Sequence, residues 1–383
     1  MSAKSIMIIA GEASGDLHGA HLARAIQNRS QTVSLFGVGG SGMLRAGVRI
    51  LIDAKTLSVM GITEVISKLP TIWRAMGTVK QVLKNEKPDL LILIDFPDFN
   101  FRVAAAAKKL KIPVLYYVSP QIWAWRRGRV KKIKRLVDHM AVIFPFEADF
   151  YRTHQVPVTF VGHPLLDKAL PTDASSITPD TGHPVIGLVP GSRGREVATL
   201  LPVMLQAASI LNQHFPGARF KVSCAATIDP ELVHDLVHHH GAGLDIEVLN
   251  TSVENIFRQS QILVAASGTV TLEAALHGVP TVIIYKISPM SYWLAKRLIK
   301  VKYIGIVNLI ADKQLLPELI QDMASPESIA QTVRDMIHDP GRLSTIKAEL
   351  LRIRELLGGP GASDRVAGIA LGLIEKQDHL PVR

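Results

Sequence analysis

The stretch AASGTVTLEAALHGVP, residues 265–280, combines small, hydroxyl and acidic side chains where a strand passes into a helix. The apolar run at its start predicts a buried parallel strand, Ser267 and Gly268 predict a turn, and apolar residues at helical spacing follow from Thr269. The N-terminus of such a helix presents unpaired N–H groups and the positive end of its dipole. We therefore predict a phosphate or pyrophosphate site at this turn.

Glu273 lies about one turn into the same predicted helix. A carboxylate there can accept hydrogen bonds from both hydroxyls of a ribose, as acidic residues do in other nucleotide-binding crevices. The alternative is a well-capped helix in which Glu273 faces solvent, and this stretch alone favours neither interpretation.

A second candidate cluster follows the first predicted strand, residues 5–10. The turn starts at Gly11 and carries Glu12, Ser14, Asp16 and His18. Ligands of open α/β sheets bind at this edge, outside the carboxyl ends of the strands. The glycines here do not spell the GxGxxG fingerprint, so we predict no NAD site. Asp16 has a second interpretation, as the N-cap of a helix that begins near Leu17.

Asp95 follows the clearest buried strand of the first half, DLLILI at 89–94, and Pro97 prevents that strand from continuing. An acid held in an apolar setting at the ligand edge has fixed geometry and a pKa open to upward tuning, as a general base requires. We predict Asp95 as such a base and Asp98 as a weaker candidate. A capping or structural aspartate is the alternative.

The segment 57–84 reads as one or two helices with more apolar side chain than a single buried stripe needs. A core helix and a lipid-facing surface are equal alternatives for it. The apolar residues that would face lipid are Val59, Met60, Ile62, Val65, Ile66, Leu69 and Trp73.

Seven cations fall within residues 126–135, beginning with Arg126, Arg127 and Arg129. Spread around a helix, they form a positive surface rather than a set of i,i+4 ion pairs. We favour contact with phosphate groups or anionic lipid over a merely solvated face. The neighbouring aromatic residues also suit single-stranded nucleic acid, but the chain has no RRM, KH or zinc-finger pattern.

The order of predicted elements indicates an α/β protein with two Rossmann-like, doubly wound domains facing a cleft. We expect a first domain over 1–167, a linker over 168–184 and a second domain over 185–358, with a last helix in 359–383 that crosses back to the first. A chain of 383 residues is long enough for two cores. Its net charge of +10 favours acidic partners, and its single cysteine excludes an intrachain disulfide.

The two-domain layout resembles that of GT-B glycosyltransferases, and motifs in order along nearly the whole chain are similar to those of the lipid-A-disaccharide synthase family. WAWRRGRV and PGSRGREV are the most specific of them. The full set is GEASGD at 11–16, LSVMGITEV at 57–65, IDFPDFN at 94–100, YVSPQIWAWRRGRV at 117–130, GHP at 162–164, PGSRGREV at 190–197, ASGTVTLE at 266–273 and WLAKRLIK at 293–300, followed by Asn308 and Leu309.

The resemblance implies an inverting transfer of 2,3-diacylglucosamine from its UDP derivative to 2,3-diacylglucosamine 1-phosphate, which forms the β-1,6 disaccharide 1-phosphate and UDP. Asp95 would be the base, with Asp98 and His18 as open alternatives. Glu12, Ser14 and Asp16, with Gly11, would line the sugar side. The residues implied for UDP are Gly191, Ser192, Arg193, Ser267, Gly268, Thr269, Glu273, Asn308 and Glu318. The chain has no DxD motif, so we expect neither a metal nor another cofactor.

The lipid substrates would give the apolar segment and the basic run a common role, as receivers of acyl chains and of anionic headgroups. No apolar run approaches the roughly 18 residues of a membrane helix, so we expect a cytoplasmic protein peripherally associated with the inner membrane and with no nucleic-acid partner. A homodimer is left open. Two rival interpretations are a UDP-N-acetylglucosamine 2-epimerase or related GT-B enzyme, and an RNA-binding protein.

Overall fold

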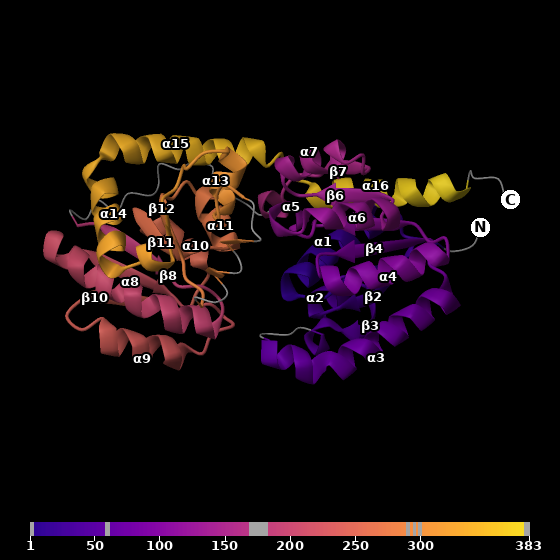
Figure 1. Ribbon diagram of the computed structural model, residues 1–383, viewed down its shortest axis with the longest axis horizontal. Coiled ribbons are helices and arrows are strands. Elements are labelled where there is room, and N and C mark those ends of the chain that lie inside the picture. Colours follow the sequence, from indigo (N-terminus) through magenta and orange to yellow (C-terminus); the bar gives the residue numbers. More distant parts are fainter. Residues whose placement is uncertain are drawn as a thin grey trace. The chain divides into compact units, whose positions relative to one another are not determined.

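The computed structural model describes residues 4–57, 62–167, 183–288, 292–293, 296–297 and 301–378. It divides into two compact units, the first formed by Met1–Lys168 with Leu357–Arg383 and the second by Ala169–Leu356 (Figure 1). The predicted linker at 168–184 lies outside the described residues except for its last two positions. Among the described residues, no helix is long and apolar enough to cross a membrane.

The first unit is built on a parallel sheet in the order β3-β2-β1-β4-β5-β6-β7. Its strands are apolar because both faces are covered, and β4 is buried along its whole length. The strands are β1 (Ser5–Ala10), β2 (Ser34–Gly39), β3 (Arg49–Asp53), β4 (Leu90–Ile94), β5 (Val114–Tyr117), β6 (His139–Val142) and β7 (Val158–Phe160).

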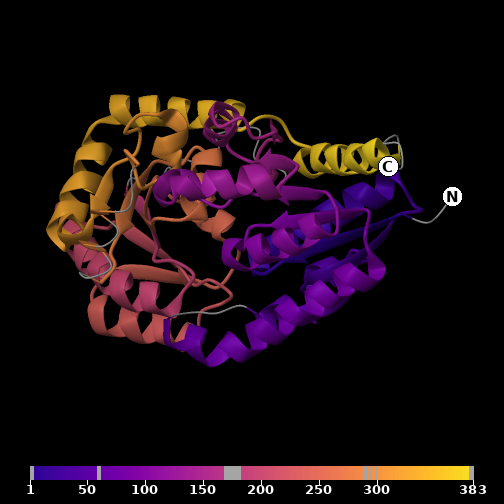
Figure 2. The same ribbon diagram turned by 45° about the vertical axis from the view of Figure 1, so that its right-hand side comes forward.

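Helices cover both faces of this sheet, because alternate strand residues point to opposite sides. Met7 and Ile9 pack on the face covered by α3 and α4, whereas Ile6 and Ile8 pack on the face covered by α1 and α16. Figure 2 shows α3 and α16 on opposite sides of the sheet. The helices are α1 (Ala13–Arg29), α2 (Ser41–Arg45), α3 (Ile62–Glu86), α4 (Pro97–Lys109), α5 (Ile122–Trp125), α6 (Val130–Leu136), α7 (Pro145–Thr153) and α16 (Ala362–Asp378).

The second unit repeats this plan with a parallel sheet in the order β10-β9-β8-β11-β12-β13. Its strands are β8 (Val185–Val189), β9 (Arg219–Ser223), β10 (Asp245–Leu249), β11 (Ile262–Ala266), β12 (Thr281–Tyr285) and β13 (Glu318–Ile320). Its helices are α8 (Gly194–His214), α9 (Pro230–His240), α10 (Val253–Gln259), α11 (Thr269–Leu276), α13 (Ile306–Ala311), α14 (Pro326–His338) and α15 (Pro340–Leu356). The predicted class, two Rossmann-like α/β domains with parallel sheets, is confirmed.

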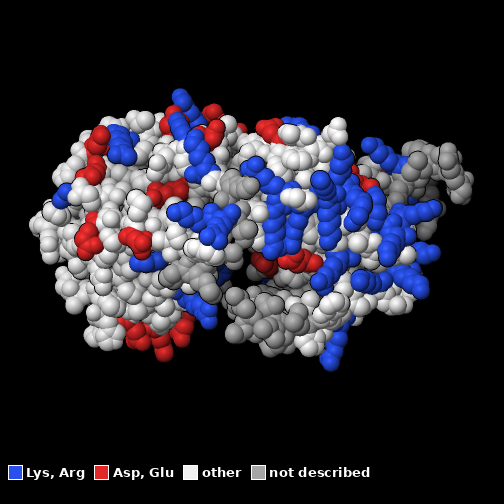
Figure 3. Space-filling model, in the orientation of Figure 1, with Lys and Arg blue, Asp and Glu red and all other residues white. Residues whose placement is uncertain are grey.

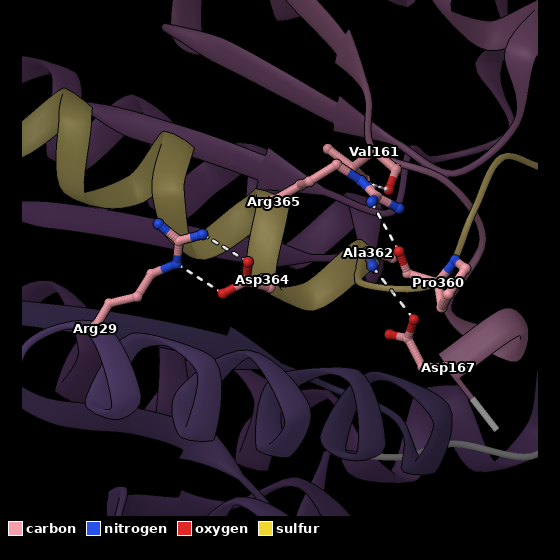
Figure 4. A network of polar contacts seen from close by, with 7 residues as sticks. All are labelled: Arg29, Val161, Asp167, Pro360, Ala362, Asp364 and Arg365. Carbon is pink, nitrogen blue, oxygen red and sulfur yellow. Dashed lines mark hydrogen bonds and ion pairs between the residues drawn. The ribbon is translucent and has the colours of Figure 1, made fainter. Parts of the chain in front are cut away.

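The C-terminal helix α16 is fixed to the first unit by polar contacts (Figure 4). Arg29 and Asp364 form two hydrogen bonds of 2.7 and 2.6 Å. Arg365 donates to the carbonyl of Val161 at 2.8 Å, and Asp167 accepts from the N–H groups of residues 361 and 362. The last helix therefore belongs to the core of the first sheet, against α1.

Several element boundaries differ from those predicted. Helix α1 begins at Ala13 rather than near Leu17, and Glu318 starts strand β13 rather than lying near a helix start. Strands β3 and β6 were not predicted, and β3 is a partly exposed edge strand. The basic run is not one helix, since a 3₁₀ turn at Arg127–Arg129 precedes α6.

Candidate active site

Asp95 lies where β4 ends and α4 begins, in a backbone conformation that few residues adopt. Its φ is +44° and that of Phe96 is +46°, both in the left-handed region. Hydrogen bonds hold this turn from both sides. The Asp95 carbonyl accepts from Asn100 Nδ2 at 2.6 Å and from the Tyr116 hydroxyl at 2.6 Å, and its N–H donates to the Tyr117 carbonyl at 3.3 Å. The side chain is thus presented by a fixed main chain.

Burial raises the pKa of Asp95 to about 6, and the nearby carboxylate of Glu12 adds to this effect while the Phe96 N–H opposes it. A carboxylate with this pKa is largely ionised at pH 7, yet it is much more basic than an ordinary aspartate. Because a general base works best when its pKa lies near the working pH, Asp95 suits proton abstraction from a hydroxyl group.

Asp98, three residues further on, lies in a more exposed and more positively charged environment than Asp95. Its side chain is 77% exposed and accepts a hydrogen bond from Arg129 Nη2 at 2.8 Å, with Arg126 Nη1 at 3.9 Å. This geometry makes Asp98 a counter-ion of the basic run, with a solvent-facing side chain paired with Arg129.

His18, on α1, is a weak base in this structure. Burial lowers its pKa to about 4, with a smaller contribution from His21, while Asp167 opposes the change. Its Nδ1 is buried and has no hydrogen-bond partner in the described part of the chain. The imidazole is therefore neutral at pH 7, and it is a poorer proton acceptor than Asp95.

Asp16 holds a neighbouring loop together. Its carboxylate accepts hydrogen bonds from the N–H groups of Gly40 at 2.7 Å, Gly42 at 2.8 Å and Met43 at 3.0 Å. The N-cap of α1 is Glu12, so the interpretation of Asp16 as the cap of that helix is wrong. Asp16 instead binds N–H groups at the start of α2, whose own N-cap residue is Gly40.

Residues 12–14 of the GEASGD turn are more exposed than Asp16. Glu12 and Ser14 are exposed at the start of α1, where they remain available to a ligand. Gly11 is needed because a Cβ there would lie 2.3 Å from the ring of Phe96. A larger residue would displace the left-handed turn that carries the catalytic candidate.

In the second unit, the PGSRGR turn between β8 and α8 contains one glycine in a conformation that L side chains rarely adopt. Gly191 has φ +117°, and a Cβ there would lie 2.7 Å from Glu196 Oε2. The Ser192 carbonyl accepts from the Thr227 hydroxyl at 2.8 Å. Arg193 pairs with Glu196 at 3.0 Å, but its side chain is 70% exposed. The turn thus offers an accessible cation beside the N-terminus of a long helix, a favourable arrangement for a phosphate group.

The strand–turn–helix predicted at 265–280 is present, with α11 starting at Thr269. The Ser267 N–H bonds to the Ile284 carbonyl at 2.9 Å, which ties the turn to the neighbouring strand. Gly268 and Thr269 are exposed, and Glu273 is half-buried one turn further on. The backbone carbonyl of Glu273 accepts from His277 Nδ1 at 2.9 Å, in the His277 tautomer that carries a proton on this nitrogen.

Asn308 and Glu318 form a joined pair. The buried amide of Asn308 donates to the Leu316 carbonyl and to Glu318 Oε1, each at 2.8 Å, and accepts from the Leu316 N–H at 2.8 Å. The carboxylate of Glu318 also accepts from the N–H groups of Ile304 and Gly305, both at 2.9 Å. Because its amide hydrogens are both used, Asn308 helps to shape the loop at 304–318.

A family model described as lipid-A-disaccharide synthetase matches residues 6–362. The lipid-A-disaccharide synthase of Geobacter metallireducens is 46% identical to this chain over 380 residues, which cover 98% of each chain. The chain belongs to the lipid-A-disaccharide synthase family. The resemblance that the motifs indicated is thereby confirmed.

Solved structures outside the lipid-A-disaccharide synthase family share its fold. MurG of Acinetobacter baumannii matches with a TM-score of 0.62 at 18% identity, over 96% of this chain and 99% of that chain. The UDP-GlcNAc 2-epimerase of Neisseria meningitidis, bound to UDP-GlcNAc, matches with a TM-score of 0.64 at 13% identity, over 96% of this chain and all of the other. These likenesses concern the fold alone, and they place the chain in the GT-B fold class.

The structure describes the side chain of only one of the apolar residues that were predicted to face lipid. Val59 and Met60 lie outside the described residues, and Ile62, Val65, Ile66 and Leu69 lie on α3 in a stretch whose side chains are not described. Trp73 is 58% exposed on the same helix, with the Arg102 guanidinium 5.0 Å from its ring centroid.

The basic run lies on the surface of the first unit. Figure 3 shows Lys and Arg side chains gathered over α4 and α6. Trp125 is exposed beside this surface, with the Arg126 guanidinium 4.0 Å from its ring centroid, whereas Trp123 is buried and donates to Glu147 at 3.0 Å. One tryptophan of the WAW motif thus anchors the segment, and the other joins the cationic surface.

Sequence reasoning missed the residues that position Asp95. Asn100 and Tyr116 bond its carbonyl, and neither was singled out. Asn100 closes the IDFPDFN motif, so its presence there was a usable signal. Tyr116 lies on a different strand, and only the sheet register brings it to Asp95.

Proposed function

We propose that this chain is a lipid-A-disaccharide synthase that transfers 2,3-diacylglucosamine from UDP-2,3-diacylglucosamine to 2,3-diacylglucosamine 1-phosphate with inversion at the anomeric carbon. Membership of the family supports the reaction. The observation that carries the mechanism is Asp95, a half-buried carboxylate on a hydrogen-bonded left-handed turn, whose pKa burial raises to about 6.

In the proposed reaction, Asp95 accepts the proton of the acceptor 6-hydroxyl while the oxygen of that hydroxyl bonds to the anomeric carbon. The bond from that carbon to the diphosphate breaks on the opposite face, and UDP leaves with the electron pair. An inverting displacement of this kind requires one base and a stabilised leaving group. The proton ends on Asp95, which releases it to solvent when the disaccharide leaves.

Residues 185–358 would bind the donor. Arg193 and the N–H groups of residues 191–194 would balance the developing charge on the diphosphate, together with Ser267, Gly268 and Thr269 at the start of α11. Glu273 would accept from the ribose hydroxyls. Asn308 and Glu318 would act by holding the loop at 304–318 in place.

Residues 1–167 would bind the acceptor, with Glu12 and Ser14 on the sugar side. Apolar residues of α3 would receive acyl chains, and Arg126, Arg127 and Arg129 would contact anionic headgroups at the cytoplasmic surface of the inner membrane. The reaction would need no metal ion, since cations of the protein and helix N-termini would serve the leaving group.

The test is a detergent-dispersed assay of purified protein with both lipid substrates, comparing the wild type with Asp95→Asn and Asp98→Asn. We expect disaccharide and UDP from the wild type, a fall in kcat of about 100-fold or more for Asp95→Asn, and a change below about threefold for Asp98→Asn. UDP binding, followed by calorimetry, should be equal in all three. A wild type that binds UDP but forms no disaccharide would refute the reaction, and an active Asp95→Asn would refute only the base.

A further inference from the structure

Two arginines of the basic run are held close to the turn that carries Asp95. Asp98 Oδ1 accepts a hydrogen bond from Arg129 Nη2 at 2.8 Å, and Arg126 Nη1 lies 3.9 Å from the same oxygen. Asp98 follows Asp95 by three residues, and three residues of extended chain span at most about 10 Å. The ion pair therefore brings two guanidinium groups to the neighbourhood of the proposed base from a segment about 30 positions later in the sequence.

The hydroxyl of Tyr116 shows that the carboxylates of Asp95 and Asp98 share one neighbourhood. Burial raises the pKa of this hydroxyl, and the negative charges of Asp95 and, more weakly, of Asp98 add to the effect. Like charges act in this way over short distances. The same hydroxyl donates to the Asp95 carbonyl at 2.6 Å. The base and the counter-ion of the two arginines thus lie around one tyrosine side chain.

Aromatic rings hold both guanidinium groups in addition to Asp98. The guanidinium carbon of Arg126 lies 4.0 Å from the ring centroid of Trp125, and that of Arg129 lies 5.8 Å from the ring centroid of Phe101. Both distances are within the range of a cation–π contact. A guanidinium group that a ring and an ion pair already fix loses less conformational entropy when it binds an anion.

The two arginines also remain accessible. The Arg126 side chain is 40% exposed and that of Arg129 is 28% exposed. Among the residues that the structure describes, Asp98 engages one of the five N–H groups of Arg129, while its distance to Arg126 is too long for a hydrogen bond. Two guanidinium groups suit a phosphomonoester, which has a charge of about −1.5 to −2 at pH 7 and three acceptor oxygens.

The acceptor of the proposed reaction carries a phosphomonoester at a fixed distance from its reacting hydroxyl. The phosphate is on C1 of the glucosamine, and the hydroxyl is on C6, which is attached to the carbon on the other side of the ring oxygen. One pyranose ring therefore separates the two groups. A site that holds the phosphate near Asp98 leaves the 6-hydroxyl to reach a base on the same turn of the protein.

We propose that Arg126 and Arg129, held in place by Asp98, bind the 1-phosphate of the acceptor and thereby orient its 6-hydroxyl toward Asp95. This inference rests on the proposed function, because that function supplies the phosphorylated acceptor. It narrows the role of the two arginines from contact with anionic headgroups in general to recognition of one phosphate group of the substrate.

The experiment measures disaccharide formation in a neutral detergent that contains no anionic lipid. It compares two acceptors, 2,3-diacylglucosamine 1-phosphate and the analogue with a 1-O-methyl group in place of the phosphate. The proteins are wild type, Arg126→Gln and Arg129→Gln, with Arg152→Gln as the matched control. Arg152 is also an exposed arginine of the first unit that pairs with an aspartate, Asp149 at 2.9 Å, but it lies on α7.

We expect Arg126→Gln and Arg129→Gln each to raise the KM of the phosphorylated acceptor about tenfold, because each removes charge-assisted hydrogen bonds to the phosphate. The donor KM and kcat should stay within about twofold of wild type, since the lost contact is made equally in the ground state and the transition state. Arg152→Gln should leave all these constants unchanged. Arg129→Lys keeps the charge but loses the planar fork, so its KM should fall between those of wild type and Arg129→Gln.

The phosphate-free acceptor separates recognition of the phosphate from a merely structural role. For the wild type, its KM should be about tenfold or more above that of the phosphorylated acceptor. Arg126→Gln and Arg129→Gln should use it as well as the wild type does, because it cannot make the contact that they lack. Damage to the fold or to the Asp95 turn would instead impair turnover of both acceptors.

Equal losses with the two acceptors would overturn the inference, and so would wild-type kinetics of both glutamine variants with the phosphorylated acceptor. Losses that appear only with anionic vesicles, and alike for both acceptors, would assign the two arginines to the membrane surface instead. Failure of the proposed function would look different, because the wild type itself would then form a disaccharide from neither acceptor.

Discussion

Replacing Asp95 by asparagine removes the charge of the proposed base while keeping its shape, and it should make the protein more stable as it becomes inactive. Asparagine tolerates the left-handed φ of +44° at this position. Burial raises the pKa of Asp95 from 3.8 to about 6, and the charged form is therefore disfavoured in the folded state by about 3 kcal/mol at pH 7. Burying the asparagine amide with incomplete hydrogen bonding costs about 1–2 kcal/mol, which offsets part of the stability gained by removing the charge. A net gain of about 1–2 kcal/mol in the free energy of unfolding remains.

The sign of the pH dependence follows from proton binding. Between pH 4 and pH 6, approximately the two pKa values of the unfolded and folded states, the folded protein binds more protons at Asp95 than the unfolded chain, so this group lowers stability as pH rises. The penalty in the wild type is nearly complete at pH 7, about half of it remains at pH 5, and about a fifth at pH 4. The advantage of Asp95→Asn should shrink in the same way.

Urea unfolding of the wild type and of Asp95→Asn at pH 7 and pH 5 measures this difference, with Asp98→Asn as the control. Asp98 is exposed and paired with Arg129, so its replacement should change stability by less than about 1 kcal/mol. A stability difference for Asp95→Asn that does not change between the two pH values would refute the argument. So would destabilisation at pH 7 alongside an unchanged fold.

Three further predictions concern other parts of the chain. Asp16→Ala leaves three N–H groups of the loop at 40–43 without their acceptor and should lower the free energy of unfolding by about 2 kcal/mol, measured with urea; no loss would contradict the capping role. Reversing the charges of Arg126, Arg127 and Arg129 to glutamate should abolish sedimentation with vesicles containing anionic lipid and spare binding of soluble UDP; unchanged sedimentation would exclude this surface as the membrane contact. Rigorous chelation should leave turnover unaltered, and a loss that magnesium restores would count against a metal-free reaction.

The strands with continuous apolar runs, β4 and β11 among them, could be predicted because burial on both faces leaves that pattern in the sequence. Asp95 was found for a related reason, since a buried strand stopped by a proline delivers the next residue to the sheet edge. Edge strands such as β3 leave a weaker pattern, because part of each side chain meets solvent. Glu318 was placed near a helix start, whereas it begins the short strand β13.

Hydrogen-bond and ion-pair partners that are distant in sequence could not be predicted from local spacing. Asp16 receives its N–H groups from residues 24 to 27 positions away, and Asp98 is paired with a guanidinium 31 positions away. Before these contacts are known, Asp16 reads equally well as a ligand-binding acid or a local cap, and Asp98 as a second base. Local spacing identified which residues could do chemistry, and tertiary contacts decided what each was able to do.

Asp95 and Asp98 show how environment assigns roles to identical side chains on one turn. Asp95 is held on backbone that is strained at two successive positions, and Val118 at the end of the adjacent strand β5 is also left-handed, with φ +60°. Such conformations cost about 1–3 kcal/mol each and persist only where surrounding contacts enforce them. Here Tyr116 and Asn100 supply that enforcement through the Asp95 carbonyl, while the Asp95 residue itself is half-buried. Because burial is the larger cause of the raised pKa of Asp95 and the Glu12 carboxylate the smaller one, a substitution that relaxes the turn and admits water to Asp95 should lower the basicity of this carboxylate.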